Sequence, residues 1–275
     1  MFLTLMYITN NTDVALIAEK NGVNRVWIDM ETLGKEERQK DRDSVKSHHT
    51  VQDVREIKRI LTKAELMVRV NPWNENSQKE IEEVISAGAD VIMLPMWKTP
   101  DEARSFISLI NGRTKTCLLL ETKEAVECID QVLQDKLPDE IHIGLNDLHL
   151  SYGMDFLFEP LANGMVEKLC KKSRKAGIPY GFGGVAKIGE GDLPSQKIIA
   201  EHYRLGSTIA ILSRSFCKID NVNNINEIEK VFSNNMKEIR HCENQVTNFS
   251  QNELEKNRME IVALVQKTVA KKSKK

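Results

Sequence analysis

Short apolar runs alternate with amphipathic segments along most of the chain. The apolar runs are nearly continuous, which is typical of parallel strands buried on both faces beneath a layer of helices. Eight such runs predict strands at residues 3–9, 25–30, 66–70, 91–95, 116–120, 140–144, 179–182 and 208–212. Strands that alternate with helices in this number predict an α/β fold, a (β/α)₈ TIM barrel.

Helix-boundary signals agree with this alternation. Ser77 and Thr99 are each followed three residues later by glutamate, the capping-box pattern, and Pro100 stands at the permitted first helical position. Glycines precede several of the apolar runs, where a residue in left-handed conformation commonly ends a helix. These glycines are Gly22, Gly88, Gly112, Gly177 and Gly206.

Two further helical segments follow the eighth strand, at about residues 225–243 and 251–270, and Ser250 and Glu253 form a third capping-box pattern. A barrel needs only one of these helices. We therefore predict a catalytic barrel domain over residues 1–243, and a C-terminal helix with a lysine-rich tail over residues 244–275. The last helix either packs across the floor of the barrel or is exchanged between the subunits of a homo-oligomer.

Composition narrows the class of partner. The 275-residue chain has a formal net charge of −1, with acidic and basic residues interspersed, so we expect a small-molecule partner rather than nucleic acid or a membrane. The five cysteines include no CxxC pair and indicate reduced thiols, as in the cytoplasm. No apolar run reaches the ~20 residues of a membrane span, and the N-terminal segment lacks the features of a signal peptide.

Polar side chains gather where the predicted strands end. Asp29 and Glu31 close the second strand, Arg69 the third, Glu121 the fifth and Asp147 the sixth. Active sites of such barrels lie at this end of the strands. Four carboxylates repel one another unless a cation compensates, so we expect a divalent metal, Mg²⁺ or Mn²⁺, for which Co²⁺ or Zn²⁺ could substitute. The alternative is a set of salt bridges that closes the barrel.

Four segments together resemble the signature stretches of the HpcH/HpaI aldolase and citrate lyase β-subunit family, a branch of the pyruvate- and phosphoenolpyruvate-binding barrels. The segments are MVRVNP (67–72), GADVIMLPM (88–96), LLLETKEAVECID (118–130) and IGLNDLHLSYG (143–153). The resemblance covers roughly residues 1–216. It implies that Glu121 and Asp147 are the metal ligands and that Arg69 binds the carboxylate or keto oxygen of a pyruvate-like substrate.

The same resemblance implies roles for the neighbouring residues. Backbone N–H groups of Gly144, Leu145 and Asn146 would bind the substrate carboxylate, and Asp29 and Glu31 would orient metal-bound waters. The implied reaction is metal-dependent cleavage or formation of a carbon–carbon bond, with pyruvate or a related 2-oxo acid as the donor and an aldehyde as its partner. Two alternatives stay open: a lyase acting on a coenzyme A thioester, and a catalytically silent barrel that binds a 2-oxo acid.

The reaction also needs a general base. Several aldolases of the family carry a histidine directly behind the acidic pair, where this chain has Thr32. The nearest histidines, His48 and His49, lie in a long polar loop on the expected active face, and we predict His49 as the base. The alternative is that both rings cap the helix that opens at Thr50.

Three other side chains are weaker candidates. Lys98 lies beyond its strand, and we expect a solvated charge there rather than a Schiff-base lysine. His142 is expected to be an interior group, whereas His149 is close enough in sequence to Asp147 to be a partner of the metal site.

A glycine-rich stretch at residues 181–191 follows the seventh strand, and Arg214 follows the eighth. Barrels frequently bind anions or phosphates at this position. We expect either a substrate-binding anion site that includes Arg214, or a flexible lid whose glycines only allow tight turns.

Overall fold

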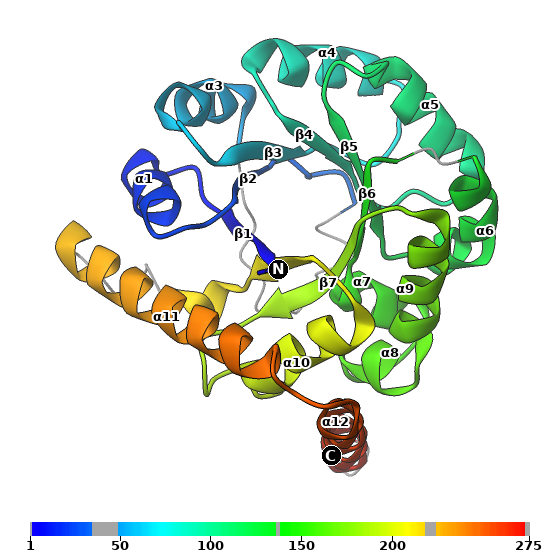
Figure 1. The fold of residues 1–275 in the computed structure, drawn as a ribbon. Helices are drawn as coiled ribbons and strands as arrows, with labels where there is room; N and C mark the ends of the chain where they lie inside the picture. The colour runs from blue at the N-terminus through cyan, green and yellow to red at the C-terminus, as the bar shows by residue number, and fades with distance from the viewer. Residues whose placement is uncertain (1, 35–48, 136–137, 218–223, 273–275) are drawn as a thin grey trace.

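The computed structural model describes residues 2–34, 49–135, 138–217 and 224–272. Within these ranges eight parallel strands close into a barrel, because the last strand pairs with the first (Figure 1). The strands are β1 (Thr4–Ile8), β2 (Arg25–Asp29), β3 (Glu65–Arg69), β4 (Val91–Leu94), β5 (Lys115–Leu120), β6 (Glu140–Ile143), β7 (Tyr180–Val185) and β8 (Ile209–Leu212). The predicted (β/α)₈ fold is confirmed, and each predicted strand lies within three residues of its observed bounds.

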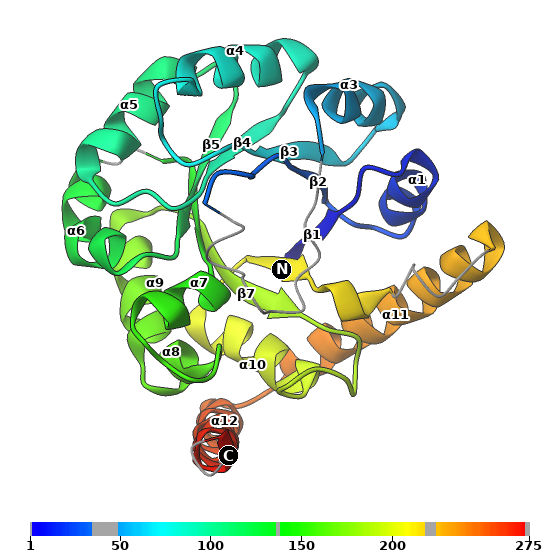
Figure 2. The same ribbon diagram turned by 180° about the vertical axis from the view of Figure 1, so that it is seen from behind.

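A ring of helices surrounds the barrel, as Figures 1 and 2 show from opposite sides. The helices of the ring are α1 (Thr12–Lys20), α3 (Val51–Ile60), α4 (Ser77–Ala87), α5 (Pro100–Ile110), α6 (Lys123–Gln134), α7 (Leu145–Ser151), α8 (Glu159–Ala162), α9 (Met165–Ala176), α10 (Ser195–Leu205) and α11 (Ile225–Val246). A last helix, α12 (Gln251–Lys272), lies outside the ring beyond α10. None of the described helices is long and apolar enough to cross a membrane.

The strands divide their side chains between two apolar clusters. On β2, Val26 and Ile28 belong to the large cluster between strands and helices, whereas Trp27 belongs to a smaller cluster inside the barrel. This division follows from the two-residue period of a strand, which sends alternate side chains to opposite faces. The interior cluster consists of Met6, Trp27, Met67, Val91, Met93, Cys117, Leu119 and Ile209.

The first residues of four strands carry charged side chains, which lie on the N-terminal side of this interior cluster. Arg25 on β2 forms a buried ion pair with Glu140 on β6 and a partly buried one with Glu65 on β3, the latter at 2.7 Å between Nε and Oε2. Lys115 on β5 also pairs with Glu65. These ion pairs close the N-terminal end of the barrel, so the mouth at the opposite end is the face on which a site can open.

The C-terminal helices pack on the outside of their own barrel. Helix α11 lies against α1 and α10, and α12 lies against α10 and α8. Three apolar side chains of α12, Leu254, Ile261 and Val265, are buried. The expectation that this helix packs across the floor of the barrel is wrong, because it packs against α10 and α8. Exchange of the helix between subunits stays a prediction.

Capping explains where several helices begin. The boxes at Thr99 and Ser250 are confirmed, with each side chain bonded to the glutamate three residues later or to its amide. The box predicted at Ser77 is wrong, because α4 begins at Ser77 itself and its N-cap is Asn76. Glu80 instead accepts hydrogen bonds from Asn71, at the end of β3. All five predicted helix-ending glycines have positive φ.

Candidate active site

The barrel brings the predicted polar cluster together at the C-terminal mouth. Asp29 and Arg69 are the last residues of β2 and β3, Glu121 directly follows β5, and Asp147 lies in the first turn of α7. Asp29, Glu31 and Glu121 are almost fully buried, at 2%, 2% and 3% exposure. Arg69 and Glu121 interact with each other and with this set, so the predicted convergence is confirmed.

Arg69 is bound to the acidic residues of β2 through its guanidinium fork. Its Nε donates to Oδ1 of Asp29 at 2.9 Å and its Nη2 to Oδ2 at 2.8 Å, while Nη2 also lies 3.3 Å from a carboxylate oxygen of Glu31. The guanidinium lies 5.1 Å from the centre of the Trp27 ring. Burial disfavours the charge, but Asp29 and Glu31 outweigh it and raise the pKa of Arg69.

The surroundings of Glu121 disfavour the ionised form of its carboxyl group. Its pKa is raised well above the ordinary value, first by burial and next by the neighbouring carboxylate of Asp147, while Arg69 opposes the shift. One of its oxygens, Oε1, accepts a hydrogen bond of 3.2 Å from the backbone N–H of Met96. Met96 has a φ of 54°, a left-handed conformation that is rare for a residue with a side chain. This backbone conformation therefore directs an amide at Glu121.

Gly144 makes room for Glu121. A Cβ at Gly144 would lie 2.7 Å from Oε2 of Glu121, closer than such atoms approach. The N–H of Gly144 donates to the carbonyl of Leu120, so the substrate contact predicted for this turn would fall to the amides of Leu145 and Asn146. Leu145 is buried and Asn146 is exposed.

The donor set suits a cation that takes only part of its coordination from the protein. Four carboxylates face one guanidinium, and the acidic excess is concentrated on the buried side chain of Glu121. Within the described residues, no three His, Cys, Asp or Glu side chains gather closely enough to hold a metal ion by themselves. Glu121 and Asp147 are the two carboxylates that could hold a hard divalent cation, with water or substrate oxygens completing its coordination.

His49 lies at the top of β2 and faces the same strand end. Its Nδ1 accepts a hydrogen bond of 3.0 Å from the backbone N–H of Asp29. Thr50 and Asp53 form the capping box of α3, and the charge of His49 contributes to a lowered pKa of Asp53. The alternative in which both rings help to cap this helix therefore stays open. His48 lies outside the described residues.

The structure also describes the contacts of His142, His149 and Lys98. The role of His149 as a partner of the metal site stays a prediction. His142 is fully buried on β6, as expected, and its Nε2 bonds to the carbonyl of Gly183. His149 is buried in α7 and bonds to the carbonyl of Leu145. Lys98 is about half exposed and lies 3.8 Å from a carboxylate oxygen of Glu124, which agrees with a solvated charge.

The glycine-rich stretch is partly a strand. Strand β7 runs through Gly181, Gly183 and Gly184 with an irregular register against β8. A Cβ at Gly183 would lie 2.8 Å from a methyl carbon of Leu145, so this glycine allows β7 to approach the Gly144 turn. The side chain of Arg214 lies outside the described part of the chain, and its role in an anion site stays a prediction.

Met96 is the site residue that the sequence did not indicate. Sequence patterns place left-handed residues at glycine or asparagine, and methionine has no such preference. Its role follows only from the tertiary contact between its amide and Glu121.

Two solved structures are similar to this chain in fold. The first, an HpcH/HpaI aldolase/citrate lyase family protein from Burkholderia cenocepacia J2315, is 16% identical with a TM-score of 0.60, covering 77% of this chain and 88% of that one. The second, an HpcH/HpaI aldolase from Desulfitobacterium hafniense DCB-2, is 14% identical with a TM-score of 0.58, covering 77% and 86%. No curated protein matches the sequence.

The sequence itself carries the family assignment. The family model for HpcH/HpaI aldolase/citrate lyase matches residues 3–178, which is more than half of the chain and includes the strand ends that bear Asp29, Arg69, Glu121 and Asp147. The chain therefore belongs to the HpcH/HpaI aldolase/citrate lyase family.

Proposed function

We propose that this protein is a metal-dependent lyase of the aldolase type that makes or breaks a carbon–carbon bond of a small 2-oxo acid. Membership of the family supports a lyase or aldolase function. The observation that carries the finer proposal is the buried carboxylate of Glu121. Burial and the neighbouring Asp147 raise its pKa, and the charge of Arg69 opposes this shift. An acidic pair of this kind, with one carboxylate buried, favours a divalent cation, Mg²⁺ or Mn²⁺.

Glu121 and Asp147 would hold the cation, which when bound would polarise the carbonyl of the substrate. Around it the chain's own residues set the geometry. The Met96 amide and the missing side chain of Gly144 fix the position of the Glu121 carboxylate. Exposed Asn146 and buried Leu145 begin α7, where the first amides of a helix can donate to a substrate carboxylate.

Arg69 would stabilise negative charge that develops on the substrate oxygen. Because Nε and one proton of Nη2 are engaged by Asp29, the guanidinium is oriented before a substrate arrives. Because Nη2 also lies 3.3 Å from Glu31, the N–H groups of Nη1 are the ones that can contact the substrate. Asp29 thus acts here as the residue that positions Arg69, a more specific role than the orientation of waters.

His49 remains our candidate for proton transfer, with a condition set by its hydrogen bond. An uncharged imidazole that accepts the Asp29 amide at Nδ1 carries its proton on Nε2. In this tautomer Nε2 can donate a hydrogen bond to the substrate, and the ring's one lone pair lies on Nδ1. To act as a base at Nδ1 it would have to give up the Asp29 amide.

The experiment is a substrate panel with and without metal. Purified full-length protein is incubated with 4-hydroxy-2-oxo acids and with acyl-CoA thioesters, in EDTA or with added Mg²⁺ or Mn²⁺, and pyruvate release and thioester loss are followed. We expect metal-dependent pyruvate release that is lost in Glu121→Gln. Activity that persists in that variant would refute the site, and thioester loss without pyruvate release would favour the coenzyme A alternative.

A further inference from the structure

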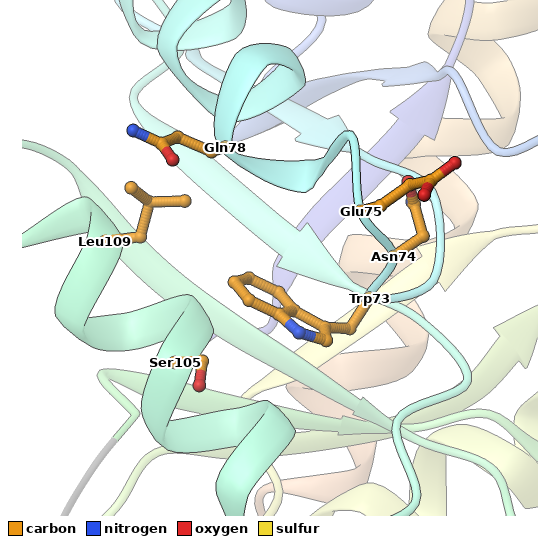
Figure 3. Close-up of a pocket in the computed structure, with 6 residues that line it drawn as sticks. All are labelled: Trp73, Asn74, Glu75, Gln78, Ser105 and Leu109. Carbon is orange, nitrogen blue, oxygen red and sulfur yellow. The ribbon is translucent and has the colours of Figure 1, made fainter.

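A cavity open to solvent lies between helices α4 and α5, and neither Glu121 nor Asp147 lines it. It has a volume of about 610 Å³. Figure 3 shows the indole ring of Trp73, from the loop after β3, pointing toward Ser105 and Leu109 on α5. The lining residues are Trp73, Asn74, Glu75, Gln78, Ser105 and Leu109.

The lining combines one aromatic ring with polar side chains, of which only Glu75 is charged. Among the chain's tryptophans, Trp27 and Trp97 are buried at 2% and 0% exposure, whereas Trp73 is only half-buried. Asn74 is used by the loop itself, since its amide donates to the carbonyl of Pro72 at 2.7 Å. In the described part of the chain, the polar side chains of Gln78 and Ser105 make no hydrogen bond to protein, so they are available to a ligand.

The charge of the cavity disfavours an anion. Glu75 is its one charged lining residue. The arginines of the neighbouring segments are engaged elsewhere, Arg104 with Asp135 at 2.9 Å and Arg113 with Glu82 at 2.6 Å. A phosphate or carboxylate ligand would therefore meet a carboxylate and no available guanidinium among these groups.

The wall that carries Trp73 is held in place by the loops around it. Oδ1 of Asn71 accepts hydrogen bonds from the amides of Thr32 at 2.9 Å and Leu33 at 3.0 Å, and its side-chain amide donates to Glu80 at 2.8 Å. These contacts fix the loop after β3 against both the loop after β2 and helix α4. A pre-formed wall of this kind reduces the ordering cost of binding.

We propose that this cavity binds a neutral, hydroxyl-bearing ring, such as the pyranose ring of a sugar. The negatively charged face of an indole attracts the C–H groups on one face of such a ring. Gln78, Ser105 and Glu75 surround it with donors and acceptors suited to hydroxyl groups. A single aromatic wall fits a sugar better than an organic cation, for which several aromatic walls form a cage.

Trp73 also supplies the reporter for the test, because it is the half-buried tryptophan and the other two are buried. The full-length protein is titrated with methyl glycosides and disaccharides while tryptophan emission and its quenching by acrylamide are recorded. Tetramethylammonium, adenosine and inorganic phosphate are titrated in parallel. We expect a saturable blue shift and protection from quenching with at least one glycoside, at millimolar concentration, and none with phosphate.

Variants that keep the reporter locate the binding. Gln78→Ala and Ser105→Ala should each raise the Kd about fivefold, the effect of one lost hydrogen bond. Ser108→Ala, an exposed serine of α5 outside the lining, is the matched control and should leave the Kd unchanged. No saturable change with any glycoside up to roughly 100 mM, equal Kd values in all three variants, or binding of tetramethylammonium or adenosine in place of glycosides would each overturn the proposal.

Discussion

Arg69 donates two parallel hydrogen bonds to Asp29, from Nε to Oδ1 and from Nη2 to Oδ2, across the register that pairs these two residues on β2 and β3. The strand pairing brings both side chains to the mouth at the same level. The guanidinium is therefore held by its own fold before any ligand binds. This arrangement separates two functions of Arg69, its attachment to Asp29 and its contact with substrate.

Replacing Arg69 by lysine should remove most of the proposed activity. A lysine keeps the charge but cannot form the fork with Asp29, so the charge is no longer oriented. We expect kcat/KM for pyruvate release to fall about 10- to 100-fold, the equivalent of a charge-assisted hydrogen bond. Arg104→Lys, which changes an exposed ion pair on α5, is the control and should be unaffected. Full activity of Arg69→Lys would refute the role given to the fork.

Gly144→Ala should damage the site more than the fold. The added Cβ would lie 2.7 Å from the Glu121 carboxylate and 3.3 Å from Leu119, so the Glu121 carboxylate has to shift from its position. The control is Gly184→Ala on β7, where a Cβ meets its nearest atom at an ordinary 3.6 Å. We expect at least a tenfold weaker metal affinity by isothermal titration calorimetry in Gly144→Ala alone. Equal affinity in both variants would show that the glycine is not needed for the pose of Glu121.

Metal binding should stabilise the protein through Glu121. A ligand that binds only the folded state raises its stability by mass action, by about 2.7 kcal/mol at a concentration of 100 Kd. In EDTA, Glu121→Gln should melt no lower than the wild type, because the substitution removes a buried charge that repels Asp147. With Mg²⁺ or Mn²⁺ the wild type alone should gain in Tm. A metal-induced shift that is the same in both proteins would place the cation elsewhere.

Two buried histidines should make the fold sensitive to acid. Burial lowers the pKa of His142 to about 4 and that of His202 to about 3, although the hydrogen bond to Gly183 opposes the shift of His142. His202 stacks on Phe182 with ring centres 3.9 Å apart and bonds to Ser207. Below pH 6.5 the unfolded chain binds protons that the folded protein does not, so stability falls as pH falls from 6.5 toward these lower pKa values.

The measurement compares urea unfolding at pH 7 and pH 5 in the wild type and in His142→Gln and His202→Asn. These substitutions keep the nitrogen that bonds to Gly183 or Ser207 and remove the titration. Each should reduce the loss of unfolding free energy between the two pH values by about 2 kcal/mol, from 1.4 kcal/mol per pH unit below pH 6.5. An unchanged pH dependence in both variants would show that the rings do not control it.

The strands and the polar residues at the mouth could be predicted from the sequence because each depends only on a short stretch of neighbouring residues. A buried strand needs a continuous apolar run. The residue that follows the strand then lies at the mouth of the barrel, independently of more distant parts of the sequence. The contacts of Glu80 and Met96 do not follow in this way. Glu80 fits a capping box, yet it bonds to Asn71 because β3 ends beside α4. Met96 adopts its left-handed φ beside a carboxylate that lies 25 residues later in the chain.

The ion pairs of Arg25 with Glu65 and Glu140 have a kinetic consequence. Because they close the N-terminal end of the barrel, reactants that reach Glu121 have to enter and leave by the same opening. Under the proposed reaction, the 2-oxo acid lies deepest, against Arg69, and the aldehyde lies between it and solvent. Turnover then follows a last-in, first-out order, in which the aldehyde departs before pyruvate and added pyruvate competes with the intact substrate.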